Sequence, residues 1–198
     1  AIDVALTPRR EVSPVALRSV LDAIRDSGSI EVRYQSMNKS RPGPIWRRIT
    51  PHALGYDGFR WHARAYCHLD NGFQDFLLPR IIDARLPGPS GAVATDDVLW
   101  QTTFEVAIGP HPSLTPGQQE IVSKDYGMRD GRLRLKIRYA MLFYVLKRLG
   151  LLEDAKLKDS RHQHIIVLNW KEAREALKRV GFEADGPSPG EERNARAR

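Results

Sequence analysis

The residues best suited to chemistry in this 198-residue sequence lie in residues 60–67, Arg-Trp-His-Ala-Arg-Ala-Tyr-Cys. Successive side chains of a β-strand point to opposite faces, so alternation divides this segment into two surfaces. The inner, apolar surface is expected to hold Trp61, Ala63, Ala65 and Cys67. The outer surface would then carry residues whose types suit contacts with phosphates and bases, namely Arg60, His62, Arg64 and Tyr66.

This division into faces makes two opposite predictions about stability. Arg64→Ala removes an outward cation, so it is expected to change stability by no more than about 0.5 kcal/mol. Trp61→Ala removes a large inward ring and is expected to cost about 3–5 kcal/mol. Cys67 ends the inward row, which favours a packed thiol over a nucleophile.

Neighbouring segments offer further candidates for anion binding. Either Arg47 or Arg48 should point outward, because adjacent strand residues face opposite ways. His52 either satisfies a backbone carbonyl or contacts a ligand. Arg80 lies in the apolar run 77–82, where an unpaired charge is costly, so it needs an acidic partner such as Asp83 or an anionic ligand.

Helix-capping residues and turn residues in the sequence predict the helices and strands that position these candidates. Residues 1–29 hold a linker and one helix, for which Ser13 is a capping residue and Pro14 suits the first turn. Residues 30–86 hold short strands separated by turn signals at residues 41–44, 56–58 and 70–72. The expected fold class is α+β, with the helix followed by a small Sm-like antiparallel β-barrel.

A second domain is expected beyond the breaker-rich segment 87–91. The order in residues 92–183 is strand, helix, strand, helix, strand, helix, which fits a layer of helices on a small sheet. Its elements are expected at residues 103–108, 115–126, 133–138, 140–152, 164–169 and 171–180. Residues 184–198 have the composition of a disordered tail.

Composition restricts the function further. Residues 30–86 carry nine Lys and Arg against five acids, and eight of the nine are Arg, which favours recognition of anions. One cysteine and no apolar run long enough for a membrane indicate a soluble cytoplasmic protein. His162 and His164 could chelate a metal, but no third ligand completes a pattern, so neither metal nor cofactor is expected. No catalytic motif is present, so the chain is not expected to be an enzyme.

Four segments together resemble the successive strands of a WYL domain: residues 30–36, residues 46–54, the segment Trp61-His62-Ala63-Arg64-Ala65-Tyr66-Cys67, and residues 75–81. His62 and Ala63 stand where the Tyr and Leu of the family triplet would be. The segment with the following Asp75-Phe76-Leu77-Leu78-Pro79-Arg80-Ile81 is similar to the CapW and BrxR branch of transcriptional repressors from phage-defence islands. Residues 104–112 and 138–146 are similar to the C-terminal extension domain of that branch.

The resemblance implies a dimeric repressor that leaves its operator when the barrel binds a signal such as single-stranded DNA or an oligonucleotide. In the family a winged helix-turn-helix binds operator DNA, and residues 1–29 are too short for one, so that domain is expected outside this chain. The apolar helix 140–152 suggests a homodimer, because one small sheet does not obviously cover it. The residues expected to bind the effector are Tyr34, Ser36, Arg47, Arg48, His52, Arg60, His62, Arg64, Tyr66 and Arg80.

Two other classes of function remain open on sequence grounds. The barrel could be a protein-interaction module whose basic face meets an acidic partner. It could also be an accessory domain of a nucleic-acid-processing enzyme. A co-purifying ligand would separate the first alternative from effector sensing, and helicase or nuclease motifs in preceding sequence would indicate the second.

Overall fold

The computed structural model describes residues 11–154, 156 and 158–182. The chain divides into two compact units, Ala1–Asp96 and Asp97–Arg198. The expected disorder of residues 184–198 falls outside the described residues.

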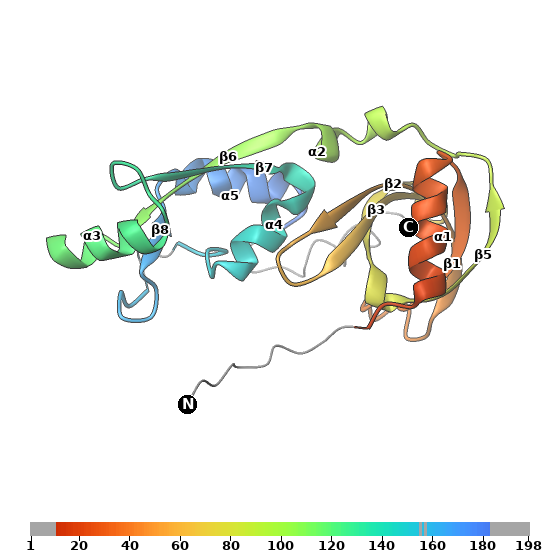
Figure 1. Cartoon of the computed structure of the whole chain (residues 1–198), viewed down its shortest axis with the longest axis horizontal. Helices are drawn as coiled ribbons and strands as arrows, with labels where there is room; N and C mark the ends of the chain where they lie inside the picture. Colours follow the sequence, from red (N-terminus) through yellow and green to blue (C-terminus); the bar gives the residue numbers. More distant parts are fainter. Residues whose placement is uncertain (1–10, 155, 157, 183–198) are drawn as a thin grey trace. The chain divides into compact units, whose positions relative to one another are not determined.

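The first unit packs one helix against a five-stranded antiparallel sheet (Figure 1). The capping prediction for the helix is confirmed, because the Ser13 hydroxyl accepts a hydrogen bond from the Ala16 amide and Pro14 occupies the first turn. The turn signals at 56–58 and 70–72 also lie between strands, with Gly58 and Asn71 at positive φ. The elements are α1 (Pro14–Arg25), β1 (Ser29–Tyr34), β2 (Ile45–Tyr56), β3 (Trp61–Cys67), β4 (Gly72–Leu77) and β5 (Ile81–Gly88).

Strand order in this sheet is β4-β3-β2-β1-β5. A short 3-10 turn, Leu78–Arg80, connects the two outermost strands, but no ladder joins β4 to β5 within the described residues. The α+β class is therefore confirmed, whereas the sheet does not close into a barrel. Bulges at Pro51/Ala53 in β2 and along the β1–β5 pairing interrupt the register and bend the strands.

The core of the first unit lies between α1 and one face of the sheet. Ala16, Val20 and Ala23 of α1 are buried together with Val32 and Ile49 of the sheet. Three residues with small side chains, Ala63, Ala65 and Cys67, complete this face on β3. Small side chains there allow close packing, so this part of the inward row is confirmed.

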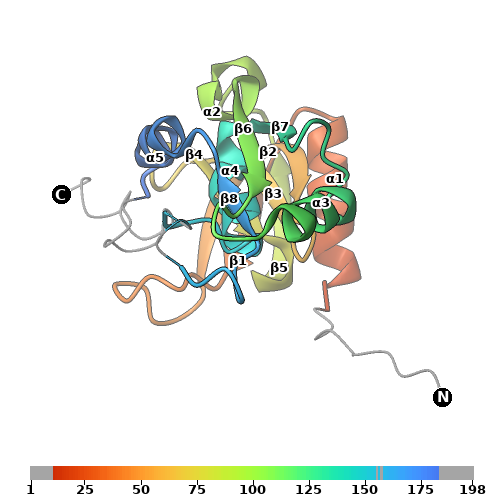
Figure 2. The same cartoon turned by 90° about the vertical axis from the view of Figure 1, so that its left-hand side faces the viewer.

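The second unit has a three-stranded antiparallel sheet in the order β7-β6-β8, with α3 and α5 flanking β6 in the view of Figure 2. Every strand and helix expected from periodicity in this part of the chain is present, with ends shifted by a few residues. The elements are α2 (Val98–Gln101), β6 (Thr103–Pro110), α3 (Pro116–Asp125), β7 (Leu133–Arg138), α4 (Tyr139–Arg148), β8 (Ile165–Val167) and α5 (Trp170–Arg179).

The apolar helix that suggested a second copy is α4, and that argument is wrong. Met141, Leu142, Phe143, Leu146 and Leu151 are each at most 8% exposed within their own chain. They pack with β6, β8 and α5 in one core. The chain therefore covers this helix itself, and the helix supplies no evidence for a dimer.

Candidate functional site

The cations of β3 are buried and paired, which corrects the expected exposed face. His62 is 1% exposed, and its Nε2 lies 3.1 Å from the Asp57 carboxylate. The same carboxylate accepts hydrogen bonds from the Arg60 side chain at 3.1 Å and from the Phe59 and Arg60 amides. Asp57 thus ties the β2–β3 turn to the start of β3.

Arg64 lies two residues after His62 on β3, so its side chain projects from the same face of the strand. It is 1% exposed, faces Asp75 across the β3–β4 ladder, and forms an ion pair with it at 3.3 Å. Trp61, expected inside, is 47% exposed and its ring lies 4.8 Å from the Tyr56 ring. The alternation itself is correct, but β3 is an interior strand buried on both faces, so the apolar row does not mark the only core side.

Both stability predictions change with this placement. Arg64→Ala would remove the cation that pairs with the Asp75 carboxylate, so this substitution is no longer expected to leave the stability unchanged. Trp61→Ala removes a ring that is 47% exposed, so it loses only about half of the buried area that the expected inward ring would lose.

Aromatic contacts surround the two remaining candidates on this side of the sheet. The Tyr66 ring lies edge-on to Phe73 at 5.3 Å and to His68 at 5.4 Å. His52 packs edge-on against Phe73 at 5.6 Å. These rings are partly exposed, and the His68 Nε2 is 2.9 Å from the Thr50 hydroxyl, which accepts from the Gly91 amide.

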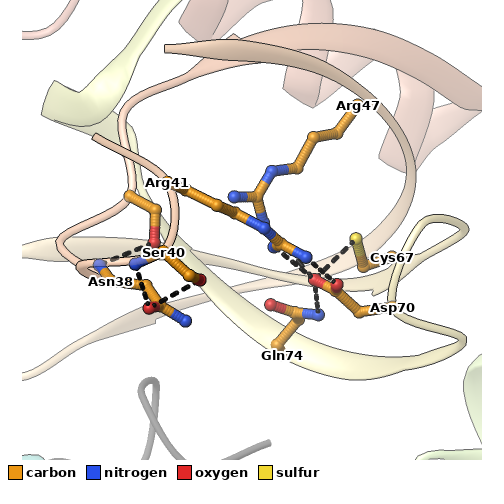
Figure 3. Close-up of polar contacts among 8 residues, drawn as sticks. Asn38, Ser40, Arg41, Arg47, Cys67, Asp70 and Gln74 are labelled. Carbon is orange, nitrogen blue, oxygen red and sulfur yellow. Dashed lines mark hydrogen bonds and ion pairs between the residues drawn. The ribbon is translucent and has the colours of Figure 1, made fainter. Parts of the chain in front are cut away.

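A second polar cluster lies at the turn between β3 and β4, centred on the Asp70 carboxylate (Figure 3). Arg41 donates to both carboxylate oxygens, at 3.1 and 2.5 Å, and Gln74 donates at 3.0 Å. Arg47 reaches the same carboxylate less closely, at 3.4 Å. Burial alone would raise the pKa of Asp70, but these hydrogen bonds and the two guanidinium charges lower it.

Arg47 is the least satisfied cation of this cluster. Its side chain is 2% exposed, on the same face of β2 as the core residue Ile49. Within the described part of the chain, its Nε and Nη2 have no hydrogen-bond partner. Each buried donor left in this way costs about 1–3 kcal/mol.

Tyr34 connects Arg47 to Arg80. The Arg47 guanidinium lies 5.5 Å from the centre of the Tyr34 ring, the Tyr34 hydroxyl accepts from the Leu77 amide, and the Arg80 guanidinium is near enough to oppose the rise in the pKa of Tyr34. Burial raises the pKa of Tyr34, so the hydroxyl stays protonated. Ser36 follows two residues later, and its hydroxyl accepts from the Asn38 amide. Three of the expected residues, Tyr34, Arg47 and Arg80, are therefore brought together.

Arg48 lies elsewhere. Its guanidinium donates to the Ser29 hydroxyl, the Leu86 carbonyl and Glu31. The choice left open between Arg47 and Arg48 is settled by the core: Arg48 is the more exposed of the two, and Arg47 is inside. The Arg80 guanidinium lies near Tyr34, a neighbour that the sequence alone did not suggest.

The carboxylates and one arginine of these clusters were missed by the sequence reasoning. Asp57, Asp70 and Asp75 each hold a cation that had been assigned to a ligand, and Arg41 was assigned to a loop. One of these pairs could have been predicted from the sequence. Asp75 and Arg64 lie opposite each other once the Asp70-Asn71-Gly72 turn sets the register of the two strands.

The remaining chemical groups do not add a reactive centre to this unit. Cys67 is buried, and burial raises the pKa of its thiol, which favours the unreactive protonated form. No group of three metal-ligating side chains occurs among residues 11–154, 156 and 158–182. A search of the same residues finds no helix able to cross a bilayer. What these clusters can do is bind an anion with buried guanidinium groups.

Comparison with known proteins agrees with this division of the chain. Residues 9–86 match the model of the WYL domain, and residues 103–173 match that of the BrxR transcriptional regulator, C-terminal dimerization domain. A solved structure, proteasome accessory factor B/C (PafBC) of Arthrobacter aurescens, shares 19% identity over 86% of this chain and 27% of its own, with a TM-score of 0.37.

Curated relatives are each named DNA-binding transcriptional repressor CapW. The protein of Stenotrophomonas maltophilia is 41% identical over 88% of this chain and 58% of its own length. That of Pseudomonas aeruginosa is 40% identical over 76% of this chain and 50% of its own. The chain thus spans about half the length of the curated relatives it matches. It carries a WYL domain followed by a BrxR-type C-terminal domain, and it is similar to the repressors named CapW.

Proposed function

We propose that this chain is the ligand-sensing and dimerisation part of a transcriptional repressor. An anionic, nucleic-acid-like effector, single-stranded DNA or an oligonucleotide, binds in the WYL unit and relieves repression of a phage-defence operon. Operator DNA is bound by another part of the protein. The relatives named as DNA-binding repressors support the regulatory role.

The observation that carries the sensing role is the buried Arg47 guanidinium. Asp70 is already occupied by both Arg41 donors and by Gln74, so it neutralises Arg47 only in part. Phosphate oxygens accept two parallel hydrogen bonds from one guanidinium, which is the number of Arg47 donors that lack a partner in the described residues. The Tyr34 ring lies beside this guanidinium, and Tyr34 and Arg80 would contact the same ligand.

The other residues predicted to bind the effector lie away from Arg47 or are already paired within the protein. Ser36 lies next to the Tyr34 end of β1, while Arg48, His52, Arg60, His62, Arg64 and Tyr66 lie on other parts of the sheet. For His62 and Arg64 to reach a ligand, the hydrogen bond between His62 and Asp57 and the ion pair between Arg64 and Asp75 would have to open. An effector can shift the repressor only through contacts that differ between its two states.

Replacing Arg47 by methionine tests this proposal. Methionine fills a similar volume without buried donors, and Asp70 keeps Arg41 and Gln74, so the melting temperature is expected to stay the same or rise. Binding of a labelled single-stranded oligonucleotide, measured by fluorescence anisotropy, is expected to weaken at least tenfold, the loss of about one charged hydrogen bond. Arg18→Met, on the exposed face of α1, is the matched control. Unchanged affinity in Arg47→Met would remove Arg47 from the proposed effector site.

Dimerisation is a separate expectation, supported by the family description of the second domain. Light scattering on the whole chain is expected to give twice the monomer mass of 22.5 kDa. A mass equal to one chain at high micromolar concentration would contradict this part of the proposal.

A further inference from the structure

A two-residue hairpin in the second unit places two arginines side by side. Asp130 and Gly131 both have positive φ, 49° and 68°, as a type I′ turn requires. Arg129 and Arg132 flank them and exchange both backbone hydrogen bonds, each 2.9 Å long. Residues paired in this way project their side chains from the same face, about 5.5 Å apart at Cα.

The row of cations continues along β7. Backbone from Arg132 to Arg138 is extended, so alternate residues share a face. All members of this row are exposed, and we call them the cationic track: Arg129, Arg132, Arg134, Lys136 and Arg138. Within the described residues β7 pairs only with β6, so the track runs along the edge of the sheet.

Few acids lie near the track. Glu105 on β6 forms an ion pair with Arg134 at 2.6 Å, and Asp130 lies in the turn. No carboxylate of the described residues lies within ion-pair distance of Arg129, Arg132 or Lys136. Around the hairpin is a groove of about 750 Å³, lined by Gly127, Arg129, Asp130, Arg132, Leu133 and Arg134.

This arrangement costs stability in the free protein. Like charges directly opposite each other on paired strands are destabilising, by roughly 0.2–1 kcal/mol. A second copy of the chain cannot relieve the repulsion between Arg129 and Arg132 through a two-fold contact centred there, because the same cations would face one another. A linear polyanion can relieve it along the whole row.

We propose that the cationic track is a second binding surface, which holds the phosphodiester backbone of a nucleic acid independently of base sequence. Four of its five cations are arginines, whose planar donors pair bidentately with phosphate. Their regular spacing, about 6.8 Å between alternate residues of a strand, matches a chain of repeated charges better than a compact ligand. The track belongs to the second unit and Arg47 to the first, so binding along the track does not require Arg47.

The test compares charge-matched double variants of the whole chain. Binding of a labelled oligothymidylate is measured by fluorescence anisotropy across a potassium chloride series. For Arg129→Gln with Arg132→Gln, we expect roughly tenfold weaker binding at low salt, and a slope of log K against log salt that is shallower by about 1.4. Removing the repulsion should leave the melting temperature unchanged or higher, which a merely structural role would not produce.

The control variant, Arg18→Gln with Lys171→Gln, removes the same charge from exposed positions outside the track and should keep the wild-type slope. Arg47→Met, measured in parallel, separates the two proposals. Loss of binding in Arg47→Met with a wild-type slope in the track variant would overturn the track and support the Arg47 site. Loss of binding in the track variant alone would support the track and contradict the Arg47 site. Equal displacement by polyglutamate would overturn the assignment to nucleic acid.

Discussion

Arg64→Ala is expected to lower the free energy of unfolding by about 3–5 kcal/mol. Arg64 and Asp75 form an ion pair at 3.3 Å, and their side chains are 2% and 11% exposed. Alanine leaves the Asp75 carboxylate without this cation in a site that water reaches poorly. The penalty is therefore the desolvation of a charge, much larger than the net value of the pair when both partners are present.

Urea unfolding followed by tryptophan fluorescence measures this loss. Arg64→Met combined with Asp75→Val replaces both charges by apolar groups and should recover most of the stability. Arg85→Ala is the matched control in the same sheet, because the Arg85 side chain is 51% exposed and that of its partner Glu31 is 24% exposed, and it should cost no more than about 1 kcal/mol. A loss below 1 kcal/mol in Arg64→Ala would mean that Arg64 is not held as described.

Stability is also expected to fall in two steps as the solution is acidified. The first step belongs to His62 and His68. Burial lowers the pKa of His62 more than the carboxylates of Asp75 and Asp57 raise it, and burial and then Arg48 lower that of His68. In the unfolded chain both histidines bind a proton below about pH 6.5, whereas in the folded chain they stay unprotonated to a lower pH. The two histidines therefore contribute their full stabilisation of the folded state above that pH. This stabilisation is lost as the pH falls toward their pKa values in the folded state.

The second step belongs to Asp57 and Asp70. Burial would raise the pKa of each carboxyl, but hydrogen bonds from His62 and the Arg60 and Phe59 amides to Asp57, and from Arg41 and Gln74 to Asp70, lower it. A carboxyl with a lowered folded pKa stabilises the protein above its unfolded value, about 3.9, and loses that contribution as the pH falls through the folded value.

Unfolding free energies measured from about pH 8 to about pH 3 should show both steps. The variant with His62→Gln and His68→Gln should lose the first step and keep the second, since glutamine can still donate to Asp57 without titrating. Asp70→Asn should make the second step smaller. A curve that is flat between about pH 8 and pH 5 in the unaltered protein would contradict the assignment to the two histidines.

Local signals in the sequence determined the elements of both units. Ser13 and Pro14 start α1 through short-range hydrogen bonding and a preset φ, and the turns at 56–58 and 70–72 depend on residues that tolerate positive φ. The periods of two and of about 3.6 residues in residues 103–180 located the strands and helices of the second unit. These features depend on neighbours within a few positions, so a single sequence contains them.

Only the tertiary structure decided which charged groups are available to a ligand. Alternation correctly separates Arg64 from Ala65, but it does not tell that β3 is covered on both faces, because burial depends on strand order. The partners of the cations come from distant positions: Asp70 lies 29 residues from Arg41 and 23 from Arg47. Desolvation and pairing therefore moved the candidate site from the row on β3 to Arg47, Tyr34 and Arg80, because a charge is stable inside a fold only where the tertiary structure supplies a counter-charge.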